Sequence, residues 1–162
     1  MAYRRSPLMQ ERLTENRERI LIAARKLIAR GGFRAASVAA VAREVGFSTG
    51  AIYRYFPAKA DLFVELLNKA VEHEVGLLRA RARAAPSAAA GLRVAVETFA
   101  GRALKGPNLA YAFIAEPTDP EVEAERIRGR RQFAAMIAAI VRRGVASGAT
   151  TSVAKWRVAS RS

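Results

Sequence analysis

Apolar residues recur every three or four positions along most of the chain, and short polar stretches with glycine or proline separate the runs. This spacing is typical of amphipathic helices, each with one buried face. Alanine is abundant, β-branched residues form few runs and only six residues are proline, so the pattern predicts an all-α protein. We expect helices over residues 14–30, 38–45, 48–56, 58–85, 87–104, 109–115 and 120–143.

The most informative stretch, residues 37–59, predicts two short helices joined by a tight turn. Four apolar residues at helical spacing give the first helix one apolar face. Gly46 ends this helix, because glycine accepts the left-handed conformation that closes a helix. Ser48 or Thr49 begins the second helix, since a hydroxyl there can accept a hydrogen bond from an unpaired amide of the first turn.

The second of these helices presents hydrogen-bond donors and no carboxylate to solvent. Ile52 and Phe56 lie four residues apart and point inward, which leaves Gly50, Tyr53 and Arg54 on the outward face. A helix, a glycine-containing turn and a second helix with such a face form the arrangement that places the second helix in the DNA major groove. The pattern alone leaves open the alternative of an ordinary helical hairpin with a solvated surface.

Residues 17–67 resemble the N-terminal domain of the tetracycline-repressor (TetR) family of bacterial transcriptional regulators, most specifically through the run GFSTGAIYRYFPAKADL. The resemblance implies a three-helix DNA-binding head, with the recognition helix at residues 48–56. It also implies that the helix after Pro57 transmits a change from a ligand-binding body to the head. Family positions that usually hold phosphates correspond to Ser37, Ser48, Thr49, Tyr53, Tyr55 and Lys59, and positions near base edges correspond to Gly50, Ala51 and Arg54.

The chemistry of these residues agrees with that sorting. Hydroxyl groups and amides at helix N-termini suit phosphate oxygens, and such contacts fix register without reading sequence. Arg54 is the one long donor on the outward face, and its planar fork can bond both acceptors of a guanine. A solvated or phosphate-bound Arg54 is the alternative. Gly50 either weakens the helix or lets it lie closer to DNA.

The charge of the chain points to an acidic partner. The formal net charge is +14, the isoelectric point is about 11.4, and residues 1–59 hold 12 Lys and Arg against 4 Asp and Glu. Nucleic acid or an anionic membrane surface fits this excess. The capped short helices with a defined turn argue against the membrane surface, so we expect double-stranded DNA as the partner and no membrane.

Other chemistry is poorly supported. The chain has no cysteine and a single histidine, His73, so we expect no metal site and no cofactor. No apolar run approaches a membrane span and no signal peptide is recognisable, so we expect a cytoplasmic protein. An enzyme is the least favoured class, because the carboxylates at residues 121–125 are better explained as the start of a helix.

We expect three segments in the chain. Residues 1–13 form a flexible basic arm, residues 14–57 the helix-turn-helix domain, and residues 58–162 a helical regulatory body that includes the connecting helix. The arm, through Arg4 and Arg5, either reaches a minor groove or stays unengaged.

The body is either a packed core or, as the resemblance implies, the enclosure of a pocket for a small, largely apolar effector. In its helix at residues 87–104 we expect Val96 to point inward, and we expect Gly144 to end the last helix. One polar contact could come from Glu116. The candidate pocket residues are Phe99, Tyr111, Phe113, Ile114, Met136 and Ile140.

After Gly144 the sequence departs from the family. Its members continue with two long apolar helices that form the dimer interface, whereas residues 145–162 carry no sustained helical stripe, so we expect a C-terminally truncated body. We expect a homodimer that this short C-terminus leaves in doubt. The leading hypothesis is an effector-responsive repressor that binds a palindromic operator. The alternative is a sequence-indifferent nucleic-acid-binding protein that has lost dimerisation.

Overall fold

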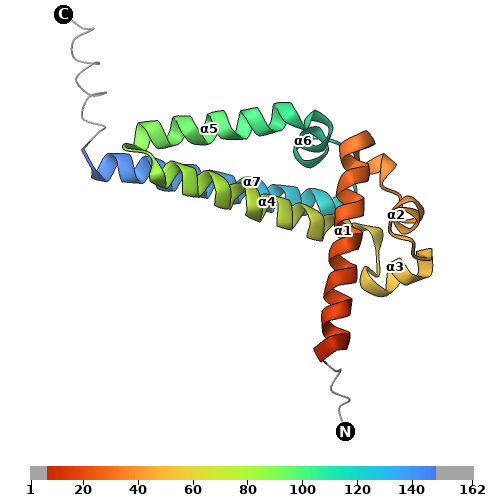
Figure 1. Cartoon of the computed structure of the whole chain (residues 1–162). Helices are drawn as coiled ribbons and strands as arrows, with labels where there is room; N and C mark the ends of the chain where they lie inside the picture. Colours follow the sequence, from red (N-terminus) through yellow and green to blue (C-terminus); the bar gives the residue numbers. More distant parts are fainter. Residues whose placement is uncertain (1–6, 149–162) are drawn as a thin grey trace, which may run out of the picture. The chain divides into compact units, whose positions relative to one another are not determined.

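The computed structural model describes residues 7–148, and each element in that range is an α-helix (Figure 1). The expected all-α fold class is therefore confirmed, and the predictions for the tail at residues 149–162 lie outside the described residues. In chain order the helices are α1 (Pro7–Ala35), α2 (Val38–Val45), α3 (Thr49–Tyr55), α4 (Lys59–Ala84), α5 (Ala88–Lys105), α6 (Pro107–Ile114) and α7 (Pro120–Ala146).

The described residues form two compact units. The head unit comprises residues 7–68 and 106–126, and the body unit comprises residues 69–105 and 127–148. Both α4 and α7 contribute residues to each unit, and α6 belongs to the head unit although it follows α5 in the chain. The functional division after residue 57 that the sequence suggests stays a prediction.

In the head unit, buried apolar side chains come from α1, α2, α3, α6 and the first turns of α4 and α7. Within it α1 packs against both α2 and α6. The two inward residues predicted for α3 are confirmed, since Ile52 and Phe56 are each 1% exposed. Other large side chains of the head unit that are buried almost completely are Ile20, Leu21, Ile28, Val41, Leu62, Phe63, Leu67 and Val122.

The first helix is longer than the sequence suggests. It begins at Pro7, so the predicted start at Thr14 is wrong. Proline suits the first helical position because it has no amide hydrogen to leave unpaired. Thr14 lies inside the helix, and its hydroxyl donates to the carbonyl of Gln10 one turn back, at 3.0 Å. The part of the predicted arm at residues 1–6 lies outside the described residues.

Two glycines interrupt α1 just after residue 30, where the sequence predicts that this helix ends. Gly31 and Gly32 have non-helical backbone angles. Gly32 has a φ of +72°, a conformation that residues other than glycine rarely adopt. The chain turns at this kink from the long part of α1 toward α2. Phe33, the next residue, is buried at 4% exposure and enters the head core.

In the body unit, α5 packs against α4 and α7 through small residues. The buried core consists of Val75, Leu78, Ala82, Ala95, Met136 and Ile140, with Val71, Ala88, Leu92, Phe99 and Phe133 packed around it. A Cβ added to Gly91 would lie 2.7 Å from the Ala82 carbonyl oxygen, so backbones approach closely here. A Cβ on Gly144 would likewise lie 2.9 Å from the Ala88 Cβ.

This packing overturns two predictions. Val96, expected inside, is 57% exposed, because α5 turns Gly91 and Ala95 toward its neighbours instead. Gly144 does not end the last helix: α7 continues through it to Ala146, since the glycine provides room for α5. Periodicity alone could not distinguish a small-residue face from the valine face next to it.

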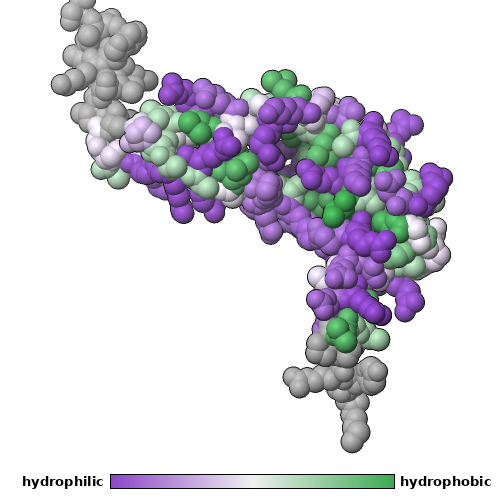
Figure 2. All heavy atoms as spheres, in the orientation of Figure 1, coloured by the Kyte–Doolittle hydropathy of each residue, from purple (hydrophilic) through white to green (hydrophobic). Residues whose placement is uncertain are grey.

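The molecular surface mixes polar and apolar side chains. Figure 2 shows hydrophilic residues over much of the visible face, with separate apolar patches between them. Within the range that the structure describes, no helix has an apolar run of the length needed to cross a membrane.

Candidate nucleic-acid interface

The turn between α2 and α3 has the geometry that the sequence predicts. Gly46 adopts the left-handed conformation, with φ +76°, and its N–H donates to the Ala42 and Arg43 carbonyls, which closes α2. The turn is also held from α1, because Arg19 donates to the Val45 carbonyl at 3.1 Å and lies over the Phe47 ring at 5.2 Å. The sequence did not single out Arg19 for this role.

Serine hydroxyls cap the first turns of both helices of the motif. The Ser37 Oγ accepts from the Ala40 amide at the start of α2, and the Ser48 Oγ accepts from the Ala51 amide at the start of α3, each at 3.1 Å. This resolves the choice between Ser48 and Thr49 in favour of Ser48 as the cap. Both serines are exposed, so their hydroxyl groups remain accessible to solvent.

The outward face of α3 is open. Thr49, Gly50, Tyr53 and Arg54 are exposed, while Ala51 and Tyr55 are half-buried. A Cβ added to Gly50 would meet no atom within 4 Å. Packing inside this chain therefore does not require glycine at that position.

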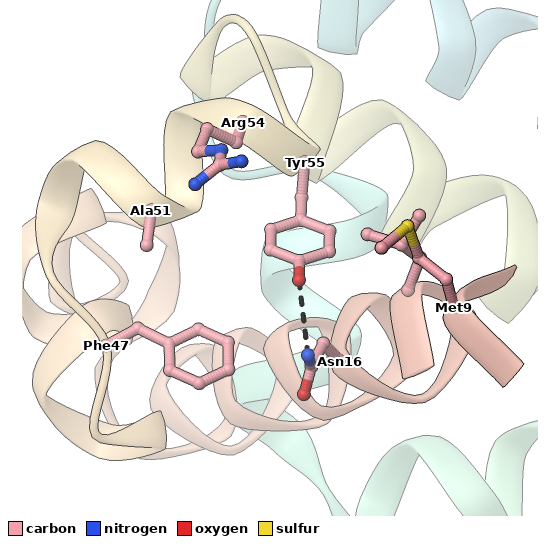
Figure 3. A pocket seen from close by; sticks show the side chains of 7 residues that line it. Met9, Asn16, Phe47, Ala51, Arg54 and Tyr55 are labelled. Carbon is pink, nitrogen blue, oxygen red and sulfur yellow. Dashed lines mark hydrogen bonds between the residues drawn. The ribbon is translucent and has the colours of Figure 1, made fainter. Parts of the chain in front are cut away.

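The C-terminal end of α3 is tied to α1. Arg17 donates through Nη1 to the Tyr55 carbonyl at 2.6 Å, and its guanidinium lies 4.2 Å from the centre of the Phe56 ring. Asn16 donates through Nδ2 to the Tyr55 hydroxyl at 3.2 Å (Figure 3). In this bond the Tyr55 hydroxyl is the acceptor, so its own hydrogen can still be donated to another group.

Arg17 also reaches α4. It forms an ion pair with Glu65, and its Nε lies 2.9 Å from one carboxylate oxygen and 3.1 Å from the other. One arginine thus connects α1, the end of α3 and α4. The sequence singled out neither Arg17 nor Glu65, because nothing in local spacing pairs residues 48 positions apart.

The start of α4 differs from a bare anion site. The Asp61 carboxylate accepts from the Ala58 amide at 2.8 Å, so one unpaired amide of the first turn is already satisfied. Lys59 is exposed, and its Nζ lies 5.1 Å from the centre of the Phe63 ring. A phosphate at this end would therefore meet the Lys59 ammonium rather than a full set of free amides.

A groove of about 500 Å³ lies between the N-terminal part of α1 and the turn and helix α3. Its lining residues are Met9, Leu13, Asn16, Phe47, Ala51, Arg54 and Tyr55. Figure 3 shows Tyr55 of α3 meeting Asn16 across the groove, with Met9 on the α1 side and Arg54 on the α3 side. Because α1 begins at Pro7, its residues Met9 and Leu13 form the α1 side of the groove. The predicted helix, which began at residue 14, did not include them.

The candidate effector residues occupy different surroundings. In the body unit, Met136 and Ile140 are buried in the core, and the rings of Phe99 and Phe133 meet edge to face with centroids 5.5 Å apart. In the head unit, the Phe113 ring lies 6.1 Å from that of Phe33, whereas Tyr111 and Ile114 are 56% and 44% exposed. That these residues line one pocket stays a prediction.

Metal chemistry finds no support in the described part of the chain. No three His, Cys, Asp or Glu side chains gather there in a way that could hold an ion, and His73 is exposed on α4.

Comparisons with known proteins point in one direction. Residues 20–66 match the family described as bacterial regulatory proteins, tetR family. The HTH-type transcriptional repressor KstR of Mycolicibacterium smegmatis is 39% identical over 67 residues, which are 41% of this chain and 33% of KstR. The HTH-type transcriptional activator FasR of the same organism is 30% identical over 114 residues, which are 68% of this chain and 52% of FasR. The chain thus spans between a third and about half of the length of these curated relatives.

Solved structures share the fold over a larger part of the chain. FadR from Bacillus subtilis, solved in complex with stearoyl-CoA, superimposes with a TM-score of 0.70 at 21% identity, covering 81% of this chain and 72% of FadR. A TetR-family transcriptional regulator from Agrobacterium tumefaciens has a TM-score of 0.68 at 24% identity, covering 84% and 74%. At these identities the similarity shows the fold.

Proposed function

This chain belongs to the TetR family of bacterial regulatory proteins, and from that membership we propose that it is a transcriptional regulator that binds double-stranded DNA through α3. The carrying observation is the outward face of α3, which offers hydroxyls, Tyr53 and Arg54 to a ligand and no carboxylate. The capped N-termini of α2 and α3 and the Lys59 ammonium supply donors for phosphates on either side. The function is not enzymatic in this proposal.

We propose specific tasks for the surface residues. In this proposal the residues that contact phosphates are Ser37, Ser48, Thr49, Tyr53, Tyr55 and Lys59. The residues that lie near base edges are Gly50, Ala51 and Arg54. The groove beside α3 supports a backbone path next to Arg54, because that arginine lines the groove and can reach either a phosphate or a guanine from it. The apolar part of the groove suits deoxyribose.

The test is selection from a random duplex library at near-physiological salt, followed by sequencing of the retained DNA. A palindrome with half-sites about 34 Å apart supports a homodimer that reads DNA with two copies of α3. A single half-site supports a head that reads DNA without pairing. Absence of any enrichment contradicts the proposal and favours the sequence-indifferent binder, whose signature is steep salt dependence without site preference.

We further propose that the regulator responds to a small, largely apolar effector. The stearoyl-CoA bound to FadR, which shares the fold, supports this. Stearoyl-CoA is therefore the first probe, with free coenzyme A as its control. A change in DNA affinity with stearoyl-CoA and none with coenzyme A supports an acyl effector, and no change with either contradicts that class.

KstR is named a repressor and FasR an activator. We propose repression for this chain. A reporter gene behind the selected DNA site tests this directly, because loss of the protein raises expression from a repressed promoter and lowers it from an activated one.

A further inference from the structure

The kink in α1 is held by a carboxylate that lies far from it in sequence. Glu116 follows α6 and is 9% exposed. Its Oε2 accepts from the Phe33 amide at 2.9 Å, across 83 positions of the chain. A buried carboxylate is costly unless donors satisfy it, so this bond is a specific requirement of the site.

The carboxylate occupies space that only glycine leaves free. A Cβ on Gly32 would lie 2.6 Å from Oε2 and 2.7 Å from Oε1 of Glu116. The positive φ of Gly32 independently favours glycine. The backbone conformation at the kink and the position of the Glu116 carboxylate therefore both require glycine at residue 32.

The loop that carries Glu116 is itself fixed. Arg126, which is 4% exposed, donates to the carbonyls of Ala112, Phe113 and Glu116 at 3.0, 3.1 and 2.7 Å. It also forms an ion pair with Glu123. Its guanidinium thus satisfies carbonyls that the end of α6 leaves unpaired, which holds the Glu116 backbone in place.

The other end of α6 holds α1 just before the kink. Asn108 donates through Nδ2 to the carbonyl of Ala29 at 3.2 Å, with that of Arg30 at 3.4 Å. Asn108 at the start of α6 and Glu116 just after its end thus bond to the α1 backbone, one on each side of Gly31 and Gly32. The Phe33 ring lies between, 4.8 Å from Phe63 of α4 and 6.1 Å from Phe113 of α6.

We propose that α6 is a strap across the α1 kink, and that Glu116 is the positioning residue that sets how α2 and α3 are presented. Phe33 lies only four positions before Ser37, the cap of α2, so a shift at its amide is carried into the helix-turn-helix motif. DNA affinity then depends on a carboxylate outside the DNA-facing surface. This inference rests on the proposed DNA-binding function.

The experiment compares three variants of the full chain on a duplex that the wild type retains. Glu116→Ala removes the acceptor, Glu116→Gln keeps an acceptor oxygen, and Glu97→Ala removes an exposed carboxylate on α5 as the charge control. Loss of a negative charge by itself strengthens binding to DNA. Weaker binding by Glu116→Ala is therefore opposite in sign to the electrostatic effect.

We expect Glu116→Ala to bind about tenfold more weakly and its Phe33 amide to exchange hydrogen faster, because a bond to a charged acceptor is lost. Glu116→Gln should stay within about threefold of wild type, since a neutral acceptor keeps much of that bond. Where Glu116→Ala fails to fold, Asn108→Ala carries the same test at the other end of the strap, with about threefold weaker binding expected.

Wild-type DNA affinity in Glu116→Ala, together with a faster Phe33 amide, would overturn the inference. Equal losses in Glu116→Ala and Glu116→Gln would also overturn it, since the acceptor oxygen would then not matter. If the wild-type chain retains no duplex, the proposed DNA-binding function is refuted instead. Hydrogen exchange still tests the strap in that case, because an unchanged exchange rate of the Phe33 amide in Glu116→Ala refutes it.

Discussion

Arg17 of α1 and Glu65 of α4 form an ion pair, and the same guanidinium donates to the Tyr55 carbonyl at the end of α3. We infer that the orientation of α3 depends on this contact between two other helices, α1 and α4. The pair is partly exposed, with side-chain exposures of 41% and 26%, which moderates its electrostatic contribution.

Replacing Arg17 should loosen α3. Arg17→Ala removes the bond to Tyr55, the pair with Glu65 and the cover over Phe56, so we expect about 1–2 kcal/mol lower free energy of unfolding. Urea denaturation measures this. Arg12→Ala, on an exposed part of α1, is the matched control and should change stability by less than about 0.5 kcal/mol. Equal effects in the two variants would contradict the anchoring role.

Arg54 and Lys59 should separate base reading from phosphate binding. Arg54→Ala is expected to relax preference at one base position by about 1–3 kcal/mol. Lys59→Ala is expected to weaken binding to all sequences alike and to lower the salt dependence. Competition binding with single-base variants of the selected duplex measures both. Uniform loss in both variants would place Arg54 on the backbone rather than on a base.

Gly50 offers a test in which folding and DNA binding change in opposite directions. A methyl group there meets no atom of this chain, so Gly50→Ala should raise the free energy of unfolding by about 0.5–1 kcal/mol. If α3 approaches DNA closely at this point, the same variant binds DNA more weakly. Gly76→Ala, also in open space on α4, is the control that stabilises without affecting DNA. Unchanged DNA affinity in Gly50→Ala would mean that close approach does not occur there.

Gly32 should be intolerant of any side chain. Gly32→Ala combines an unfavourable φ with a Cβ placed on the Glu116 carboxylate, so we expect a loss of about 2 kcal/mol or more in stability. Gly46→Ala shares the positive φ but has open space, and its loss should be smaller. Thermal unfolding of Gly32→Ala with and without Glu116→Ala isolates the clash, and additive losses would show that the carboxylate does not contribute to it.

Much of the helix-turn-helix motif could be predicted because its signals are local. The Gly46 terminator, the Ser48 cap and the inward residues Ile52 and Phe56 each act within one or two helical turns. A glycine conformation, a hydroxyl near an amide and a spacing of four residues are properties that a short segment has by itself. The assignment of Arg54 to bases or phosphates stays a prediction, because it depends on DNA.

The sequence by itself thus determined the helical class and the helix-turn-helix motif, since each follows from contacts between near neighbours in the chain. Tertiary structure alone decided that α5 buries Gly91 and Ala95 rather than Val96, that Arg17 pairs with Glu65, and that Glu116 reaches the Phe33 amide. These outcomes depend on which surfaces meet after the helices pack. Glu116 and the Phe33 amide lie 83 positions apart in the chain, so no local sequence pattern indicates their hydrogen bond. Only the packing of the folded chain brings them together.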